Sequence, residues 1–146
     1  MNQKIVDEAK TWLGTPYHGG AKLKGIGVDC GQFLIGVVEG AGLIKPGEID
    51  PGHYSQDWPL HRSGEMYLSW IEKYCDRVSG EPQPGDFLLY RYGRCISHAS
   101  IVINYPVVIH SYINQGVIIS NENDGIFKMK NGTTRLFGIY RFREVK

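Results

Sequence analysis

Apolar residues recur at helical spacing in three segments of the first half of the chain: 5–13, 30–41 and about 64–74. Gly14 and Gly42 follow the first two segments directly, and a glycine just beyond the last periodic residue is a common helix end. Of the connecting stretches, 15–29 is rich in glycine and lysine, and 43–63 contains several prolines and glycines. The pattern therefore predicts three helices, joined by a long loop and an irregular connection.

From Glu81 onward, short apolar runs with many β-branched and aromatic residues replace the helical pattern. They are separated by turn residues and read FLLYR, HASIVI, PVVIHSY, GVIIS and LFGIYRF. Such runs predict strands of an antiparallel sheet. Because the helices precede the strands, the order of elements is typical of an α+β fold. We therefore predict a single domain over 1–146, in which a helical half (about 1–80) packs on a C-terminal half (about 81–146) with a sheet of about five to six strands.

Composition narrows the function classes. The chain has 146 residues, of which 42% are hydrophobic and 21% charged, which is ordinary for a globular protein. A net charge of +1 gives no electrostatic basis for a nucleic-acid partner. The start, MNQKIVDEAKTW, lacks the apolar core of a secretory signal, and no stretch approaches the ~18 apolar residues of a membrane span. Three cysteines without C-x-x-C spacing favour a reducing compartment. From these two observations we expect no signal peptide and a cytoplasmic setting.

The segment GVDCGQF places Cys30 at the start of the second predicted helix. Asp29, directly before it, is a good N-cap residue. The unpaired N–H groups and the dipole at a helix N-terminus favour negative charge, so they lower the pKa of a thiol there. The backbone N–H of Cys30 could also face a developing oxyanion. The alternative interpretation of Cys30 is a buried cysteine that packs as a small hydrophobic residue.

A nucleophilic thiol needs a base, and the strand half offers His98 and His110 on successive predicted strands. Two buried imidazoles are costly unless they serve each other or a site. Side chains alternate between the faces of a strand, so a two-residue loop at the NYP turn would put the two rings on opposite faces. A loop of odd length or a bulge would put them on the same face. The sequence leaves this register open.

The segments WLGTPYHGG, DC at a helix start, QPGDFLLY, SHASIVI and VVIHSY together resemble the NlpC/P60 family. These are papain-like cysteine peptidases of bacterial cell walls, which phages also encode. The resemblance runs from about residue 9 to residue 140, with its elements in the expected order. It implies a papain-like fold with Cys30 as nucleophile, His98 as general base and His110 as the polar residue that orients the base.

The same resemblance implies a substrate and its binding residues. Tyr17 matches a tyrosine beside the catalytic cysteine, and we place His18 and Asp29 with it in the substrate-binding site. The implied reaction cleaves an amide bond of peptidoglycan stem peptides, with the D-glutamyl–diamino acid bond as the candidate, through a thiol acyl-enzyme. It requires neither a metal nor an organic cofactor. One departure is DCGQ in place of the usual DCSG, which puts Gly31 at the serine position.

The stretches HYSQDW and GEMYLSWIEKY resemble the phage-tail branch of the family. This resemblance adds phage tail proteins to the expected partners, beside the peptidoglycan peptide. It also adds a phage virion to the expected locations.

Several alternative interpretations remain at this point. Cys95, His98 and His110 could ligate zinc, although strand alternation puts Cys95 and His98 on opposite faces and favours a loop or edge position for Cys95. Cys75, at the end of the third predicted helix, is interpreted as a packing residue. Lys22 and Lys24 are either solvated or partners of a substrate carboxylate. The fold could also belong to a binding or assembly protein that cuts nothing, or to an acyltransferase or thioesterase with the same Cys–His site.

Overall fold

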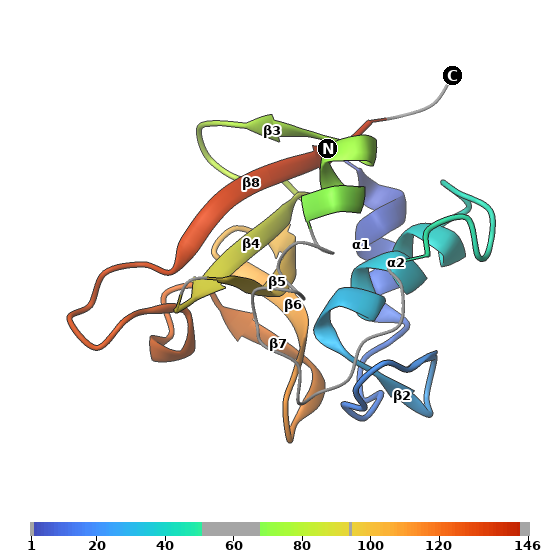
Figure 1. The fold of residues 1–146 in the computed structure, drawn as a ribbon, viewed down its shortest axis with the longest axis horizontal. Coiled ribbons are helices and arrows are strands. Elements are labelled where there is room, and N and C mark those ends of the chain that lie inside the picture. The colour runs from blue at the N-terminus through green and yellow to red at the C-terminus, as the bar shows by residue number, and fades with distance from the viewer. Residues whose placement is uncertain (1, 51–67, 94, 144–146) are drawn as a thin grey trace.

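A computed structural model describes residues 2–50, 68–93 and 95–143, and it shows helices packed against a six-stranded antiparallel sheet (Figure 1). The helices are α1 (Gln3–Lys10), α2 (Cys30–Gly40) and a third helix whose described part covers 68–74. Between α1 and α2 lies a small hairpin of β1 (Lys22–Leu23) and β2 (Gly27–Val28). The sheet consists of β3 (Cys75–Val78), β4 (Phe87–Tyr92), β5 (Cys95–Asn104), β6 (Val107–Tyr112), β7 (Gly116–Asn121) and β8 (Leu136–Phe142). Its strand order is β3-β8-β4-β5-β6-β7.

This architecture confirms the predicted α+β fold, and the five predicted apolar runs correspond to β4 through β8. Two local predictions were wrong. Cys75 opens β3 instead of ending a helix, because it pairs with Phe142 of β8 at the edge of the sheet. The predicted loop 15–29 carries the β1–β2 hairpin, whose two-residue strands are too short to show any periodicity. Residues 64–67 of the third predicted helix and the stretch HYSQDW lie outside the described residues.

Close contact between α1 and α2 fixes the position of α2. A Cβ at Gly36 would lie 2.6 Å from the Trp12 ring, so this glycine allows the ring to pack directly on the helix backbone. The Trp12 ring also meets Phe33 edge-on, with 6.0 Å between ring centroids. Its indole Nε1–H donates to Glu8 Oε2 at 3.0 Å. The Trp12 ring therefore helps to position α2 by packing on it at Phe33 and Gly36.

Both faces of the sheet are buried in its centre. One face packs on α1 and α2 through the main apolar core, which includes Phe33, Leu34, Val37, Phe87, Leu89, Ala99, Ile101 and Ile109. The other face carries a second cluster, Leu88, Tyr90, Val102, Val108 and Phe127. Phe127 belongs to the 3-10 helix η1 (Gly125–Phe127), in the connection between β7 and β8. Burial on both faces explains why β4 and β5 read as continuous apolar runs instead of alternating ones.

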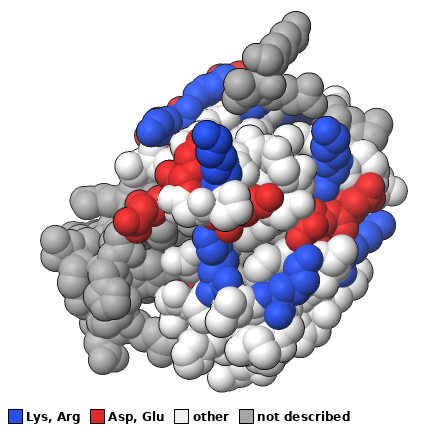
Figure 2. Space-filling view, turned by 90° about the vertical axis from the view of Figure 1, so that its right-hand side faces the viewer, with Lys and Arg blue, Asp and Glu red and all other residues white. Residues whose placement is uncertain are grey.

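Charged side chains of both signs are interspersed on the helical side of the molecule (Figure 2). Lys22 bonds to Glu39 at 2.7 Å and Lys24 to Glu8 at 2.8 Å, so each lysine links the β1–β2 segment to a helix. These ion pairs favour a structural role for the two lysines over binding of a substrate carboxylate. Among the described residues, no helix is long and apolar enough to cross a bilayer.

Candidate active site

The start of α2 is built around Asp29. Its Oδ1 accepts a hydrogen bond from the backbone N–H of Gln32 at 2.8 Å, which caps the helix. Its Oδ2 accepts one from the backbone N–H of Gly20 at 2.7 Å, which ties the preceding segment to the helix start. Asp29 is 3% exposed. Its burial and both hydrogen bonds fit a structural cap better than the predicted role in substrate binding.

Cys30 is the first residue of α2, and its thiol meets the strand half directly. The Sγ–H donates to the carbonyl oxygen of Ser97 on β5 at 3.5 Å. Pairing between β4 and β5 passes from Tyr90–His98 to Arg91–Ile96, so Ser97 is the extra residue of a bulge. The sulfur therefore lies against the residue that precedes His98.

A second irregularity in β5 settles the register that the sequence left open. Val102 pairs with Val108 and Asn104 pairs with Val107, so one additional residue of β5, Ile103, lies in a bulge before the turn. Without this bulge, a two-residue loop would put His98 and His110 on opposite faces. With it, the two histidines share a face on neighbouring strands, and their ring centroids are 4.9 Å apart.

The two imidazoles are joined in a buried polar chain. His98 Nε2 and His110 Nδ1 share a hydrogen bond of 2.7 Å. His110 Nε2 lies 2.8 Å from Ser120 Oγ on β7, which extends the chain by one further residue. Sequence reasoning did not single out Ser120, because a serine within a predicted strand carries no motif and its partner depends on strand register.

Burial keeps both rings neutral. It lowers the pKa of His98 well below the ordinary 6.5, and the neighbouring His110 lowers it further. Burial also lowers the pKa of His110 to about 4, against a smaller opposite effect of Asp124. Aromatic rings surround the pair: Tyr90, Tyr92, Tyr112 and Phe127. A neutral imidazole has a lone pair, so His98 is in the state that can accept a proton.

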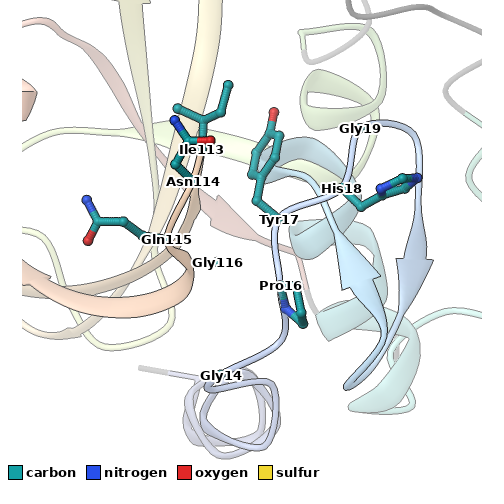
Figure 3. A pocket seen from close by; sticks show the side chains of 9 residues that line it. All are labelled: Gly14, Pro16, Tyr17, His18, Gly19, Ile113, Asn114, Gln115 and Gly116. Atoms are coloured by element: carbon teal, nitrogen blue, oxygen red, sulfur yellow. The ribbon is translucent and has the colours of Figure 1, made fainter.

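A surface pocket of about 690 Å³ lies between the segment 14–19 and the β6–β7 turn at 113–116. The Tyr17 ring stands between the two segments, whereas the His18 ring extends away from the turn (Figure 3). Burial raises the pKa of the Tyr17 hydroxyl, and the charges of Cys30 and Asp29 raise it further. Tyr17 also forms a β-bridge with Val28, two residues before Cys30, which places this wall of the pocket near the start of α2. Sequence reasoning did not single out the turn residues, since a turn after a strand carries no motif for binding.

The alternative zinc site does not form. Cys95 opens β5 and is buried, and the rings of His98 and His110 bond to each other. Within the described part of the chain, no group of three or more His, Cys, Asp or Glu side chains is arranged to hold a metal ion.

Among protein families, the model described as the NlpC/P60 family matches residues 14–135. No curated protein matches the chain. Among solved structures, an NlpC/P60 family protein from Bacillus cereus superposes with a TM-score of 0.66 at 18% identity, over 99% of this chain and 40% of that chain. The chain thus spans about two fifths of the length of that protein.

Two mycobacterial structures are also similar. The peptidoglycan hydrolase RipB from Mycobacterium tuberculosis has a TM-score of 0.58 at 18% identity, over 99% of this chain and 64% of that chain. RipD from the same organism, described as a non-catalytic NlpC/p60 domain protein adapted to peptidoglycan binding, has a TM-score of 0.55 at 13% identity, over 98% of this chain and 96% of that chain. At these identities the similarity shows a shared fold.

Proposed function

The chain belongs to the NlpC/P60 family, and we propose that it is a cysteine hydrolase that cleaves an amide bond in peptidoglycan stem peptides. One observation carries the proposal. Cys30 begins a capped helix with its thiol against the β5 bulge, and the residue after that bulge is His98, bonded to His110. This arrangement supplies a nucleophile, a base and a group that orients the base.

The reaction follows from these positions. The Cys30 thiol gives its proton to the His98 Nδ1 atom, because Nε2 is engaged by His110. The thiolate attacks the amide carbonyl carbon while the backbone N–H of Cys30 stabilises the oxyanion. The His98 imidazolium then protonates the leaving amine as the C–N bond breaks, which leaves a thioester. Water attacks the thioester with His98 as base, and the acid and the free thiol are released.

The substrate class rests on the family. RipB is described as a peptidoglycan hydrolase, and the proposed bond, between D-glutamate and the diamino acid, comes from the family resemblance. The pocket beside Tyr17 is the proposed binding site for the peptide, since Tyr17 forms a β-bridge with Val28, two residues before Cys30. Attachment to a phage tail is a further proposal, resting on sequence resemblance alone.

Incubation with defined stem peptides tests the proposal, with mass spectrometry of products and of the intact protein. The wild type should release a peptide with a new amino terminus and pass through a covalent adduct that weighs one acyl group more. Cys30→Ser should bind the same peptides and release nothing. Binding without cleavage by the wild type would contradict hydrolysis and support a binding role like that of RipD. Transfer of the acyl group to an added amine, without acid release, would instead indicate an acyltransferase.

A further inference from the structure

Ser120 extends the buried chain of the site to β7, the outer strand of the sheet next to β6. Its hydroxyl lies 2.8 Å from His110 Nε2, and His110 Nδ1 lies 2.7 Å from His98 Nε2. The side chain that meets Ser120 is fully buried, since His110 is 0% exposed. Any proton on that nitrogen therefore depends on Ser120 for an acceptor.

Two neutral arrangements of protons fit the 2.7 Å contact between the imidazoles. In the first, His98 Nε2–H donates to His110 Nδ1, so His98 Nδ1 has a lone pair and His110 carries its proton on Nε2. In the second, His110 Nδ1–H donates to His98 Nε2, so the His98 proton is on Nδ1 and the ring cannot accept one from a thiol. Only the first arrangement is productive, and it needs an acceptor at His110 Nε2.

The Ser120 hydroxyl can accept a hydrogen bond in the first arrangement and donate one in the second, so its presence alone does not favour either. The two arrangements differ in how much free energy each would lose if the hydroxyl were removed. Without Ser120 Oγ, the productive arrangement leaves a buried N–H without a partner, whereas the unproductive one leaves only a ring lone pair. An orphaned buried donor is the rarer and costlier of the two in folded proteins. The imidazolium needs the acceptor even more, because both nitrogens of His98 then carry protons and His110 keeps its proton on Nε2.

We infer that Ser120 is a positioning residue of this site: its hydroxyl accepts from His110 Nε2–H and so keeps His98 Nδ1 free to take the thiol proton. The inference rests on the proposed cysteine chemistry and adds a fourth member to it. Ser120 acts only through His110 and touches no reacting atom.

Other titratable groups around the pair do not supply this acceptor. Those that face it from neighbouring elements are Tyr90 and Tyr92 on β4, Tyr112 on β6 and Asp124 after β7, while Cys30 on α2 interacts with Tyr92. Burial raises the pKa of Tyr92 to about 12, and its hydroxyl donates to the Ile126 carbonyl. The Tyr90 hydroxyl bonds with Ser100 at 2.9 Å. Asp124 Oδ2 accepts from the backbone N–H of Asn121 at 3.1 Å.

The test compares Ser120→Thr with Ser120→Val. These variants have nearly the same shape and both suit a strand, but only threonine keeps the hydroxyl. Long-range ¹⁵N–¹H correlation spectra of histidine-labelled protein report which nitrogen of His110 carries the proton. The alkylation rate of Cys30 against pH reports how readily the thiol transfers its proton. Neither readout needs a peptide substrate, so failure of stem-peptide hydrolysis would leave this inference testable.

We expect threonine to keep the Nε2–H form of His110 and the wild-type alkylation profile. Valine should shift His110 toward the Nδ1–H form and move the alkylation profile to higher pH. Alkylation at pH 7 should fall by about tenfold or more, the size of a lost hydrogen bond to a charged group. Unfolding curves that match between the two variants would show that the change is local. Equal proton positions and equal alkylation in the two folded variants would overturn the inference, whatever the outcome with peptidoglycan.

Discussion

His98 and His110 are 6% and 0% exposed, and burial to that degree makes the positively charged form of an imidazole unfavourable. A proton can therefore stay on His98 only when a negative partner forms beside it. In the proposed reaction that partner is the Cys30 thiolate, so the charge appears as an ion pair in one step. The same burial should make the folded protein less stable at acidic pH.

The free energy of unfolding should fall as the pH drops from about 6.5 to about 4. Burial lowers the pKa of His110 to about 4 and that of His98 below 6.5, so the unfolded chain binds more protons than the folded protein in this range. His110 alone should account for a loss on the order of 3 kcal/mol. Urea unfolding of the wild type and of His110→Asn at pH 7, 5.5 and 4.5 measures it. The variant should show a shallower decline, and an identical decline in both proteins would contradict the assignment.

The residues of the site differ in how well their roles could be predicted from the sequence. Cys30, His98 and His110 could be singled out because they stand in segments that together resemble a family. Ser120 has no such mark, since its role exists only because the β6–β7 register brings it near His110. Asp29 differs again, because its helix cap was predicted and is observed, whereas its predicted substrate contact stays a prediction.

At the scale of elements, two bulges in β5 decide the geometry of the site. One lies at Ser97 beside the Cys30 thiol, and the other at Ile103 aligns the two histidines on one face. The sequence left the register at the NYP turn open, because the position of a bulge depends on pairing along whole strands. The strands themselves were predictable, whereas their register was not.

A contact between the β6–β7 turn and the Thr15 segment gives an element-scale prediction. Gly116 has φ +78°, and a Cβ there would lie 2.4 Å from the Thr15 carbonyl oxygen. Gly116→Ala should therefore push the turn away from the segment that carries Tyr17 and lower the free energy of unfolding by on the order of 2–4 kcal/mol.

Gly132→Ala is the matched control, because Gly132 has φ +86° with nothing within 4 Å of its Cβ position. It should lose only about 1 kcal/mol, the cost of a left-handed conformation for alanine. Urea unfolding of both variants beside the wild type gives the comparison. Equal losses would mean that the contact with Thr15 does not hold the pocket wall in place.

At the scale of the whole molecule, the site exists only where the two halves of the chain meet. The thiol comes from the helical half and the imidazoles from the sheet, and Ser97 lies 67 positions after Cys30 in the chain. Sequence reasoning predicted this division and the helical cover of one sheet face. It did not predict the apolar layer that buries the other face of the sheet. Phe127 of that layer lies in a three-residue 3-10 helix, which is too short to show a pattern in the sequence. This second apolar layer, which contains Phe127, completes the burial of the two histidine rings.

The most direct test of the account is the alkylation rate of each cysteine against pH, located by mass spectrometry, in the wild type and in His98→Ala. Burial raises the pKa of Cys75 to about 12, so this thiol should stay slow and serve as an internal control. Cys30 should react fastest of the three cysteines, already at pH ~6, and His98→Ala should remove its advantage. A Cys30 that reacts no faster than a cysteine in an unfolded peptide, or that ignores the loss of His98, would contradict the nucleophile.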